Sequence, residues 1–401
     1  MAALETFRAE TRAWLEENAP ASLRGSRSTA IDGVWGGRKA VWDNPDEKLW
    51  LERMADKGWT APEWPTEYGG GGLSRDEAKI LDQEMRSLEV PLAVIGFGLE
   101  MIGPVLLRYG TEDQKKRHLT KICRGEVRWC QGYSEPGAGS DLASVQMKGV
   151  LDGDTYTVNG QKIWTSYADL SDWIFCLVRT EPDKNKHEGI SFILIDMDQP
   201  GVSVKPILLI SGKSPFCETF FEDAKASTDD VVHEVGAGWT VAKALLGHER
   251  GMIAGIFGTG GGSGRSKGRG ALVEAAAAHL GEADGRLADP VKRDRIVQCE
   301  MDTRAFSLTV QRSSDGAKAG HHPGPETSLF KVYGTEFNQR RTELVTDILG
   351  PNALGWEGPG FVQTEIDATR DWLRARGNTI EGGTSEVQLN IIAKRVLGLP
   401  D

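Results

Sequence analysis

The sequence predicts an α+β protein in which two helical regions flank a β region, and three observations support this. Near the N-terminus, Leu4, Phe7 and Trp14 recur at the spacing of one helix face. From residue 127 to about 235, short apolar and alternating runs without helix-length segments favour an antiparallel barrel or sandwich over a parallel sheet. From Gly238 onward the helical period returns. We expect three domains: an N-terminal helical domain (1–126), a middle antiparallel β-barrel or sandwich (127–235) and a C-terminal helical bundle (236–401).

Composition narrows the class of protein. A chain of 401 residues exceeds one typical domain, and contents of 39% hydrophobic and 26% charged residues fit a soluble globular protein. The net charge of -11 argues against a nucleic-acid partner, because phosphate binding needs a cationic face. The five cysteines form no CxxC pair and are odd in number, which disfavours a disulfide framework or a zinc site. We therefore expect a cytoplasmic protein with no bound metal.

Targeting and membrane segments are not expected. The first residues carry acids from the start and are typical of an amphipathic helix, unlike a signal or transit peptide. The longest apolar stretch, residues 91–107, is interrupted by Glu100 and by glycines, and is too short to span a bilayer. We expect no membrane partner.

Local signals place several helices. Residues 46–54 indicate a helix with an acidic start. Ser74 with Glu77, and Thr111 with Gln114, are capping boxes that predict helices starting just after each cap. The main helix candidates of the C-terminal region are residues 239–257, 293–312, 327–349 and 385–397. The glycine-rich tract 258–270 lacks a preceding strand and a GKS/T sequence, so we interpret it as a weakened helix or an exposed loop.

Strand signals fill the middle region. Residues 155–158 precede Asn159-Gly160, a pair typical of a type I′ hairpin turn, and residues 162–164 follow as the expected returning strand. Apolar runs at 173–178 and 190–195 predict two further strands.

The most informative stretch is residues 133–141, YSEPGAGSD. Small residues let a backbone approach a flat polar ligand closely, and hydroxyls beside them can bond to ring heteroatoms or phosphate oxygens. Trp164, within WTS, can cover one face of such a ring. Far downstream lies EGGTSE at residues 381–386.

In their order and spacing these motifs resemble the acyl-CoA dehydrogenases, flavoenzymes that desaturate acyl thioesters. The resemblance covers nearly the whole chain and includes NGQKIW at 159–164, ERG at 249–251 and GTSEVQ at 383–388. It implies the three-domain fold, FAD as cofactor, an acyl-CoA substrate and a role in lipid catabolism such as β-oxidation. It also implies an electron-transfer flavoprotein as acceptor, and a homo-oligomer, either a dimer or a tetramer.

The resemblance also assigns cofactor contacts. Ser134, with backbone groups around Gln131 and Tyr133, should meet the isoalloxazine ring, while Trp164 should lie against the ring and Ser166 should reach its N5 edge. The remaining assignments are Gly139 and Ser140 at the pyrophosphate or the thioester, Thr384 and Glu386 near the cofactor, and Ser140 with Arg250 at the substrate.

Desaturation needs a base for the α-proton and an acceptor for the β-hydride, which is the flavin N5. The family places the base at either of two positions. One is occupied here by Gly382, which has no side chain; the other is Glu249, followed by Arg250. We therefore predict that Glu249 takes the proton, and that the N–H of Gly382 helps hold the developing enolate oxygen. Glu381 is the rival base, although a structural or cofactor contact is the preferred interpretation for it.

Two departures from the family pattern leave alternatives open. The Arg-x-x-Phe-Gly stretch that binds the partner subunit's pyrophosphate is replaced by residues 281–290, with Arg286 as a loose substitute. A Gln-x-x-Gly-Gly stretch is replaced by residues 347–351, and Asp347 is unfavourable near a pyrophosphate unless an Arg compensates. The chain is thus a complete dehydrogenase, a non-catalytic or co-catalytic subunit of a heteromeric one, or an oxygen-using flavin oxidase or monooxygenase. A nicotinamide enzyme is disfavoured because a strand–GxGxxG–helix unit is missing.

Overall fold

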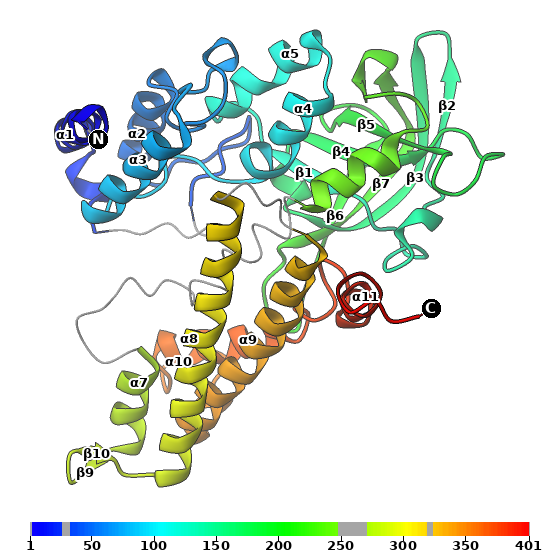
Figure 1. Ribbon diagram of the computed structural model, residues 1–401. Helices are drawn as coiled ribbons and strands as arrows, with labels where there is room; N and C mark the ends of the chain where they lie inside the picture. Colours follow the sequence, from blue (N-terminus) through cyan, green and yellow to red (C-terminus); the bar gives the residue numbers. More distant parts are fainter. Residues whose placement is uncertain (1, 26–32, 248–270, 319–323, 401) are drawn as a thin grey trace. The chain divides into compact units, whose positions relative to one another are not determined.

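The computed structural model describes residues 2–25, 33–247, 271–318 and 324–400. The chain divides into two compact units, the first of residues 1–207 with 215–245 and the second of residues 208–214 with 246–401. Helices precede the β region in the first unit and dominate the second, so the predicted α+β class is confirmed (Figure 1).

The helices of the first unit begin where local cap chemistry places them. The Ser74 hydroxyl accepts from the Glu77 N–H and the Glu77 carboxylate accepts from the Ser74 N–H, and Thr111 with Gln114 repeats this pair. Both predicted capping boxes are confirmed. The helices pack around a core that contains Trp50 and Leu81. Their bounds are α1 Ala2–Asn18, α2 Pro45–Asp56, α3 Arg75–Ser87, α4 Gly103–Tyr109 and α5 Glu112–Cys123, with a π-helical turn Gly98–Ile102.

The strands form one eight-stranded sheet in the order β6-β7-β3-β2-β4-β5-β8, with β1 also beside β4. Pairing is antiparallel except where β1 and β2 meet β4. The mainly antiparallel sheet is as predicted, and so are strands over 173–178 and 190–195. The bounds are β1 Trp129–Gly132, β2 Lys148–Asp152, β3 Thr155–Ser166, β4 Trp173–Arg179, β5 Ile190–Asp196, β6 Val202–Ile207, β7 Phe216–Ser227 and β8 Val231–Val232.

The predicted hairpin turn at Asn159-Gly160 is wrong. Strand β3 continues through both residues, and the register with β7 shifts between Val158 and Gly160, which marks a bulge. The Asn159 side chain donates to the Asp223 carboxylate on β7 and accepts from the Asp223 N–H, each at 2.9 Å. The actual turn lies at Gly153, where φ is +61°, between Asp152 and its partner Thr155. An Asn-Gly pair suits either setting, because a bulge also exploits the conformational freedom of glycine.

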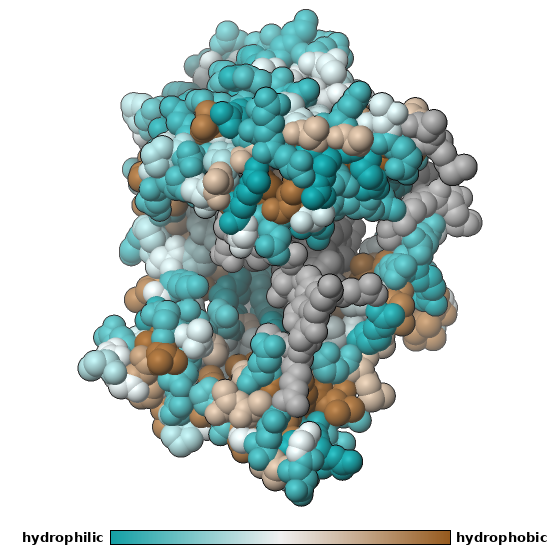
Figure 2. Space-filling view, turned by 90° about the vertical axis from the view of Figure 1, so that its left-hand side faces the viewer, coloured by the Kyte–Doolittle hydropathy of each residue, from teal (hydrophilic) through white to brown (hydrophobic). Residues whose placement is uncertain are grey.

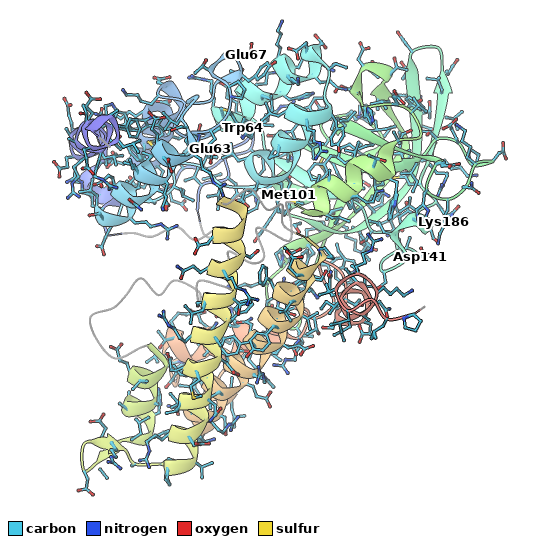
Figure 3. All side chains as sticks on the ribbon, in the orientation of Figure 1. Glu63, Trp64, Glu67, Met101, Asp141 and Lys186 are labelled. Carbon is cyan, nitrogen blue, oxygen red and sulfur yellow. The ribbon has the colours of Figure 1, made fainter. Side chains whose placement is uncertain are left out.

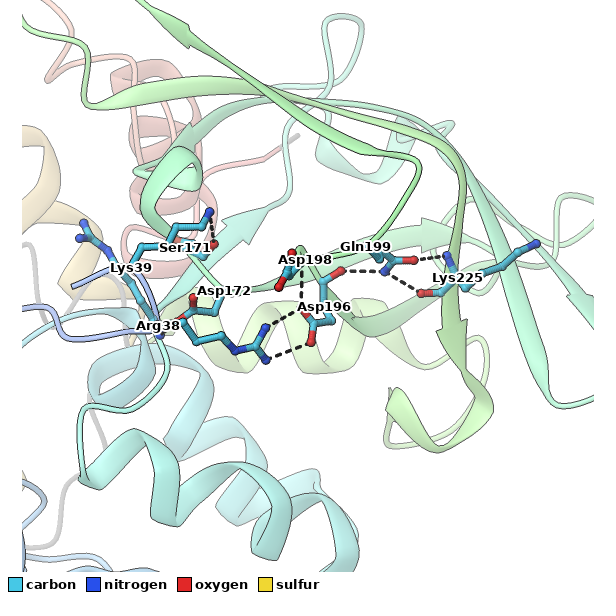
Figure 4. Close-up of polar contacts among 9 residues, drawn as sticks. Arg38, Lys39, Ser171, Asp172, Asp196, Asp198, Gln199 and Lys225 are labelled. Carbon is cyan, nitrogen blue, oxygen red and sulfur yellow. Dashed lines mark hydrogen bonds and ion pairs between the residues drawn. The ribbon is translucent and has the colours of Figure 1, made fainter. Parts of the chain in front are cut away.

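The chain before α2 is bonded to the linker that follows β3 (Figure 4). The Arg38 N–H donates to the Asp172 carboxylate at 2.9 Å, and the Lys39 ammonium donates to the carbonyls of Asp169 and Ser171. The Arg38 guanidinium also forms a two-bond pair with Asp196, at 3.0 Å for each bond. The contacts to Asp169, Ser171 and Asp172 hold the linker that follows β3, and the contact to Asp196 holds the end of β5.

The second unit is a helical unit with a core that contains Phe337 and Leu344. The predicted helices over 293–312, 327–349 and 385–397 are present, the last ending in a π-helical turn, Ile392–Val396. Helices α7 and α10 were not predicted. Residues 238–247 are helical as expected, and those up to 245 belong to the first unit. Residues 248–257 and the tract 258–270 lie outside the described residues. The bounds are α7 Ala271–Leu280, β9 Glu282–Ala283, β10 Arg286–Leu287, α8 Pro290–Lys318, α9 Ser328–Leu349, α10 Gln363–Ala375 and α11 Ser385–Ile391.

The face drawn in Figure 2 is mostly hydrophilic, with hydrophobic side chains scattered singly or in small groups. Across the described ranges, none of the helices combines the length and the apolar character that a membrane crossing requires. All five cysteines are buried free thiols.

Candidate functional site

Trp164 breaks the regular alternation of β3. Its φ is +61°, and the register with β7 shifts between Ile163 and Thr165. Lys162 and Thr165 are fully buried on either side, whereas 52% of the Trp164 surface is exposed. The bulge therefore turns the indole out of the sheet, where its nearest ring partner is the edge-on Phe216 at 6.0 Å. A bulky residue at positive φ is uncommon and costs about 1–2 kcal/mol.

A tight turn stands beside this bulge. Glu135 and Ala138 exchange both backbone hydrogen bonds, at 3.1 and 3.0 Å, which closes the turn over Pro136 and Gly137. The Ile163 N–H donates to the Ser134 carbonyl at 2.9 Å. The structure thus brings the YSEPGAGSD stretch and Trp164 together, as the sequence motifs predicted.

The turn rests on a buried ion pair. The Lys162 ammonium donates to the Glu135 carboxylate at 2.8 Å and to the Tyr133 carbonyl at 3.0 Å, and Lys162 is fully buried. Glu135 also accepts from the N–H groups of Gln146 and Met147, at 2.6 and 2.9 Å. Burial lowers the pKa of Lys162, and the Glu135 carboxylate opposes that shift. Sequence reasoning missed this pair.

The other candidates of the first unit lie around the turn. Gln131 lies in β1, and Tyr133 follows directly after the strand ends at Gly132. Tyr133 is buried, with its ring near Phe175. Ser166 ends β3, opposite Phe216. A Cβ added at Gly139, or at Gly137, would meet no atom of the described chain within 4 Å, and Ser140 is exposed. The loop therefore has an open face toward which a ligand can approach the backbone.

The loop after the turn is also bonded at its far side. The Lys186 ammonium pairs with the Asp141 carboxylate, at 2.9 Å to the nearer oxygen, and Figure 3 shows the two side chains close together. The buried Arg179 donates to the carbonyls of Ala143 and Lys186, each at 2.8 Å. Both contacts link the loop to the segment between β4 and β5.

The EGGTSE motif lies in the second unit. Gly382 and Gly383 have φ of +63° and +87°, a pair of left-handed residues that favours glycine at both positions. The Thr384 hydroxyl accepts from the Val387 N–H at 3.2 Å and so caps α11. Glu386 is exposed in the first turn of α11, and hydrogen bonds from its own N–H and from Thr384 lower its pKa.

The rival base Glu381 is engaged in structural contacts. Its carboxylate accepts from Arg374 at 2.7 Å and from the Asn378 side chain at 2.6 Å. These bonds match the structural interpretation of Glu381. The preferred base Glu249 and the substrate candidate Arg250 lie outside the described residues.

The unusual carboxylate Asp347 is compensated. Lys292 and Arg295, both on α8, pair with it, and the hydrogen bond from Lys292 is the main cause of its lowered pKa. Arg286 is exposed on the β9–β10 hairpin. Asp347 is thus held within its own unit by neighbouring cations.

Three family models match the chain in order. They describe the acyl-CoA dehydrogenase N-terminal domain at residues 3–126, the middle domain at 130–224 and the C-terminal domain at 236–397. The chain belongs to the acyl-CoA dehydrogenase family. The family, and with it an oxidoreductase of the acyl-CoA dehydrogenase type, is as the motifs predicted.

Individual members of the family are similar over the full length. Acyl-CoA dehydrogenase IpdE1 of Mycobacterium tuberculosis is 37% identical over 400 residues, covering 99% of this chain and 98% of that protein. The solved structure of the Tcur3481-Tcur3483 steroid ACAD matches with a TM-score of 0.76 at 31% identity, over 100% of this chain and 98% of that one. The ChsE4-ChsE5 complex from Mycobacterium tuberculosis matches with a TM-score of 0.73 at 29% identity, over 100% and 98% of the two chains.

Proposed function

We propose that this acyl-CoA dehydrogenase binds FAD at the Trp164 bulge and desaturates the α,β bond of an acyl-CoA thioester, with Glu249 as the base. The observation that carries the proposal is the half-exposed indole, held at positive φ beside an open glycine loop. Packing within the protein does not account for the strained backbone of Trp164, because half of its side chain is exposed. Contact between the indole and one face of a flat ring would account for it.

The residues around the bulge fit the cofactor. Within the described chain, the hydroxyls of Ser134 and Ser166 take part in no hydrogen bond, and both residues are partly exposed. Such hydroxyls suit the polar edge of an isoalloxazine ring. We further assign Gln131, Tyr133, Gly139 and Ser140 to the same cofactor. Thr384 and Glu386 remain FAD contacts proposed from the family resemblance.

Bound FAD supplies the two-electron acceptor that no protein side chain offers. The chain itself supplies the base: the carboxylate of Glu249 takes the proton from the α-carbon. Gly382 supports this assignment, because its φ of +63° makes a carboxylate-bearing residue there strained. Its N–H is the proposed donor to the thioester oxygen, and Ser140 and Arg250 are proposed to hold the acyl-CoA.

The proposed acyl group is a steroid-derived one. Support comes from the 31% identity to a protein described as a steroid ACAD, over the whole of this chain. The proposed electron acceptor is an electron-transfer flavoprotein, the proposed location is the cytoplasm, and the domain limits are proposed at residues 126 and 235. An oxygen-using oxidase is the alternative that fast reoxidation of the reduced enzyme in air would favour.

For assembly, a hetero-oligomer is favoured over the homotetramer expected from the family. Residues 281–290 lack the Arg-x-x-Phe-Gly sequence, and Arg286 stands on a small exposed hairpin. Two of the similar structures carry the names of two different chains, Tcur3481-Tcur3483 and ChsE4-ChsE5. A second chain that completes the cofactor site would compensate for the missing sequence.

The test is an anaerobic titration of the purified protein with steroid-derived and straight-chain acyl-CoAs, followed through the flavin absorbance. We expect a yellow protein whose flavin bleaches with the steroid-derived substrate. Glu249→Gln should keep the flavin and lose bleaching, whereas Glu381→Gln should bleach normally if it folds. A colourless chain that binds no FAD, alone or with its co-expressed partner, contradicts the proposal; loss of bleaching in Glu381→Gln alone would move the base to Glu381.

A further inference from the structure

Lys162 is the most deeply buried charge near the proposed cofactor site. It has no exposed surface, although it lies only two positions before the half-exposed Trp164. Its ammonium reaches two acceptors, the Glu135 carboxylate at 2.8 Å and the Tyr133 carbonyl at 3.0 Å. Lysine is almost never fully buried unless it is paired, so the burial of Lys162 depends on these two acceptors.

Both carboxylate oxygens of Glu135 accept hydrogen bonds from the protein. One carboxylate oxygen accepts from the Gln146 N–H at 2.6 Å, and the other accepts from the Met147 N–H at 2.9 Å and from Lys162. Glu135 therefore joins the start of the loop to its end, eleven and twelve residues further along the chain. Lys162 lies on β3, the strand that carries Trp164, so its bond to Glu135 connects the loop to that strand.

The loop between Glu135 and Gln146 contains two glycines whose Cα positions face empty space. Between Glu135 and Gln146 lie Gly137 and Gly139, where an added Cβ would meet no atom within 4 Å, and the exposed Ser140. An added Cβ at either glycine meets no atom, so the position of these residues relative to the indole depends on the contacts of the rest of the loop. Lys186 and Arg179 hold the loop on its far side, at Asp141 and Ala143. The Glu135–Lys162 pair links its start to β3, next to the backbone bond from Ile163 to Ser134.

We propose that Lys162 and Glu135 are positioning residues: the buried pair sets the loop of residues 136–145 against the Trp164 bulge, so that FAD meets a preformed site. The inference rests on the proposed function for its cofactor. The pair does not touch the reacting atoms; it acts through the backbone of the loop.

The first experiment uses Lys162→Met, which keeps most of the side-chain volume and removes the charge and its donors. Since this variant leaves Glu135 without its counter-ion, it is compared with the double variant Lys162→Met/Glu135→Gln, in which both charges are absent. Amide hydrogen exchange is measured on the flavin-free full chain, with its co-expressed partner if one copurifies. We expect faster exchange at residues 137–142 in both variants and unchanged exchange in β5.

The second experiment measures FAD affinity of the same proteins by flavin fluorescence. We expect at least tenfold weaker binding in the double variant, equal to about 1.4 kcal/mol, with a melting temperature close to that of the unaltered protein. The matched control is Lys184→Met, which removes an exposed ammonium that pairs with Glu181 at 2.8 Å on the neighbouring loop. It should change neither measurement.

The outcomes separate the two claims. If the unaltered protein binds no FAD, the proposed function fails, and the exchange data alone decide the positioning claim. If FAD binds equally well to the unaltered protein and the double variant, or if loop exchange is unchanged, the positioning claim is overturned. If Lys162→Met fails to fold, the hydrogen exchange and FAD affinity of the double variant, which has no unpaired carboxylate, test the positioning claim.

Discussion

The indole of Trp164 gives the sharpest test of the cofactor site, through the variants Trp164→Ala and Trp164→Gly. The side chain leaves 52% of its surface exposed. A Trp buries up to ~250 Å². About 130 Å² is therefore available, of which a ring lying on one face would cover about half. At ~25 cal/mol per Å² this burial contributes about 1.6 kcal/mol.

Aromatic contact adds about 1 kcal/mol, so the loss on truncation is about 2–3 kcal/mol, or roughly 30- to 150-fold in the dissociation constant of FAD. The assay is a fluorescence titration of flavin-free protein with FAD. Trp164→Gly separates binding from folding. Because φ is +61°, glycine relieves backbone strain, and this variant should unfold at the same denaturant concentration as the unaltered protein or higher.

Val150→Ala is the matched control, since Val150 is an apolar residue with 62% exposure on β2 of the same sheet. It should leave FAD affinity unchanged. Should Trp164→Ala bind FAD as tightly as the unaltered protein, the argument from the exposed indole fails, and the bulge needs another explanation.

Three further predictions concern stability and the flavin environment. His118 is 3% exposed between Trp129 and Trp173, and burial, with the nearby charges of Arg117 and Lys121, lowers its pKa to about 4. The unfolded chain binds this proton near pH 6.5, so stability is complete above that pH and falls by about 3 kcal/mol as the pH drops toward 4. His118→Leu should remove most of that decline in urea unfolding compared at pH 7 and pH 4.5; an equal decline in both proteins speaks against it. Ser134→Ala should shift the absorbance of bound flavin while the exposed-strand control Ser203→Ala does not, and identical spectra for both would count against ring contact. Gly382→Ala should lose about 1 kcal/mol of unfolding free energy, because its φ is +63°; no loss would argue for a different backbone there.

Features set by neighbouring residues were predictable from the sequence. The caps at Ser74 and Thr111 involve partners only three residues away, so their chemistry is complete within the local chain. Helix α10 was missed because it starts after Val362, which offers no side-chain oxygen to cap it. Helix α7 is rich in alanine and carries a weak polar–apolar period.

Features set by distant partners were not predictable. Glu135 lies 27 residues before Lys162, and nothing in either local sequence signals the pair. A lysine beside a tryptophan is ordinarily solvated, so its complete burial follows only from the fold. The same limit explains the hairpin error, since the partner of Asn159 is Asp223, 64 residues away on β7.

The wrongly predicted turn and the proposed cofactor site lie on the same strand, β3. The register of β3 with β7 shifts twice, at Asn159-Gly160 and at Trp164. At the first, Gly160 makes room for Met147, since an added Cβ there would lie 2.7 Å from the Met147 Cγ. Met147 in turn donates its N–H to Glu135, the carboxylate that binds Lys162. The two bulges thus flank one buried ion pair. In a regular strand, Trp164 would lie on the same buried face as Lys162, so the second bulge is what exposes the indole.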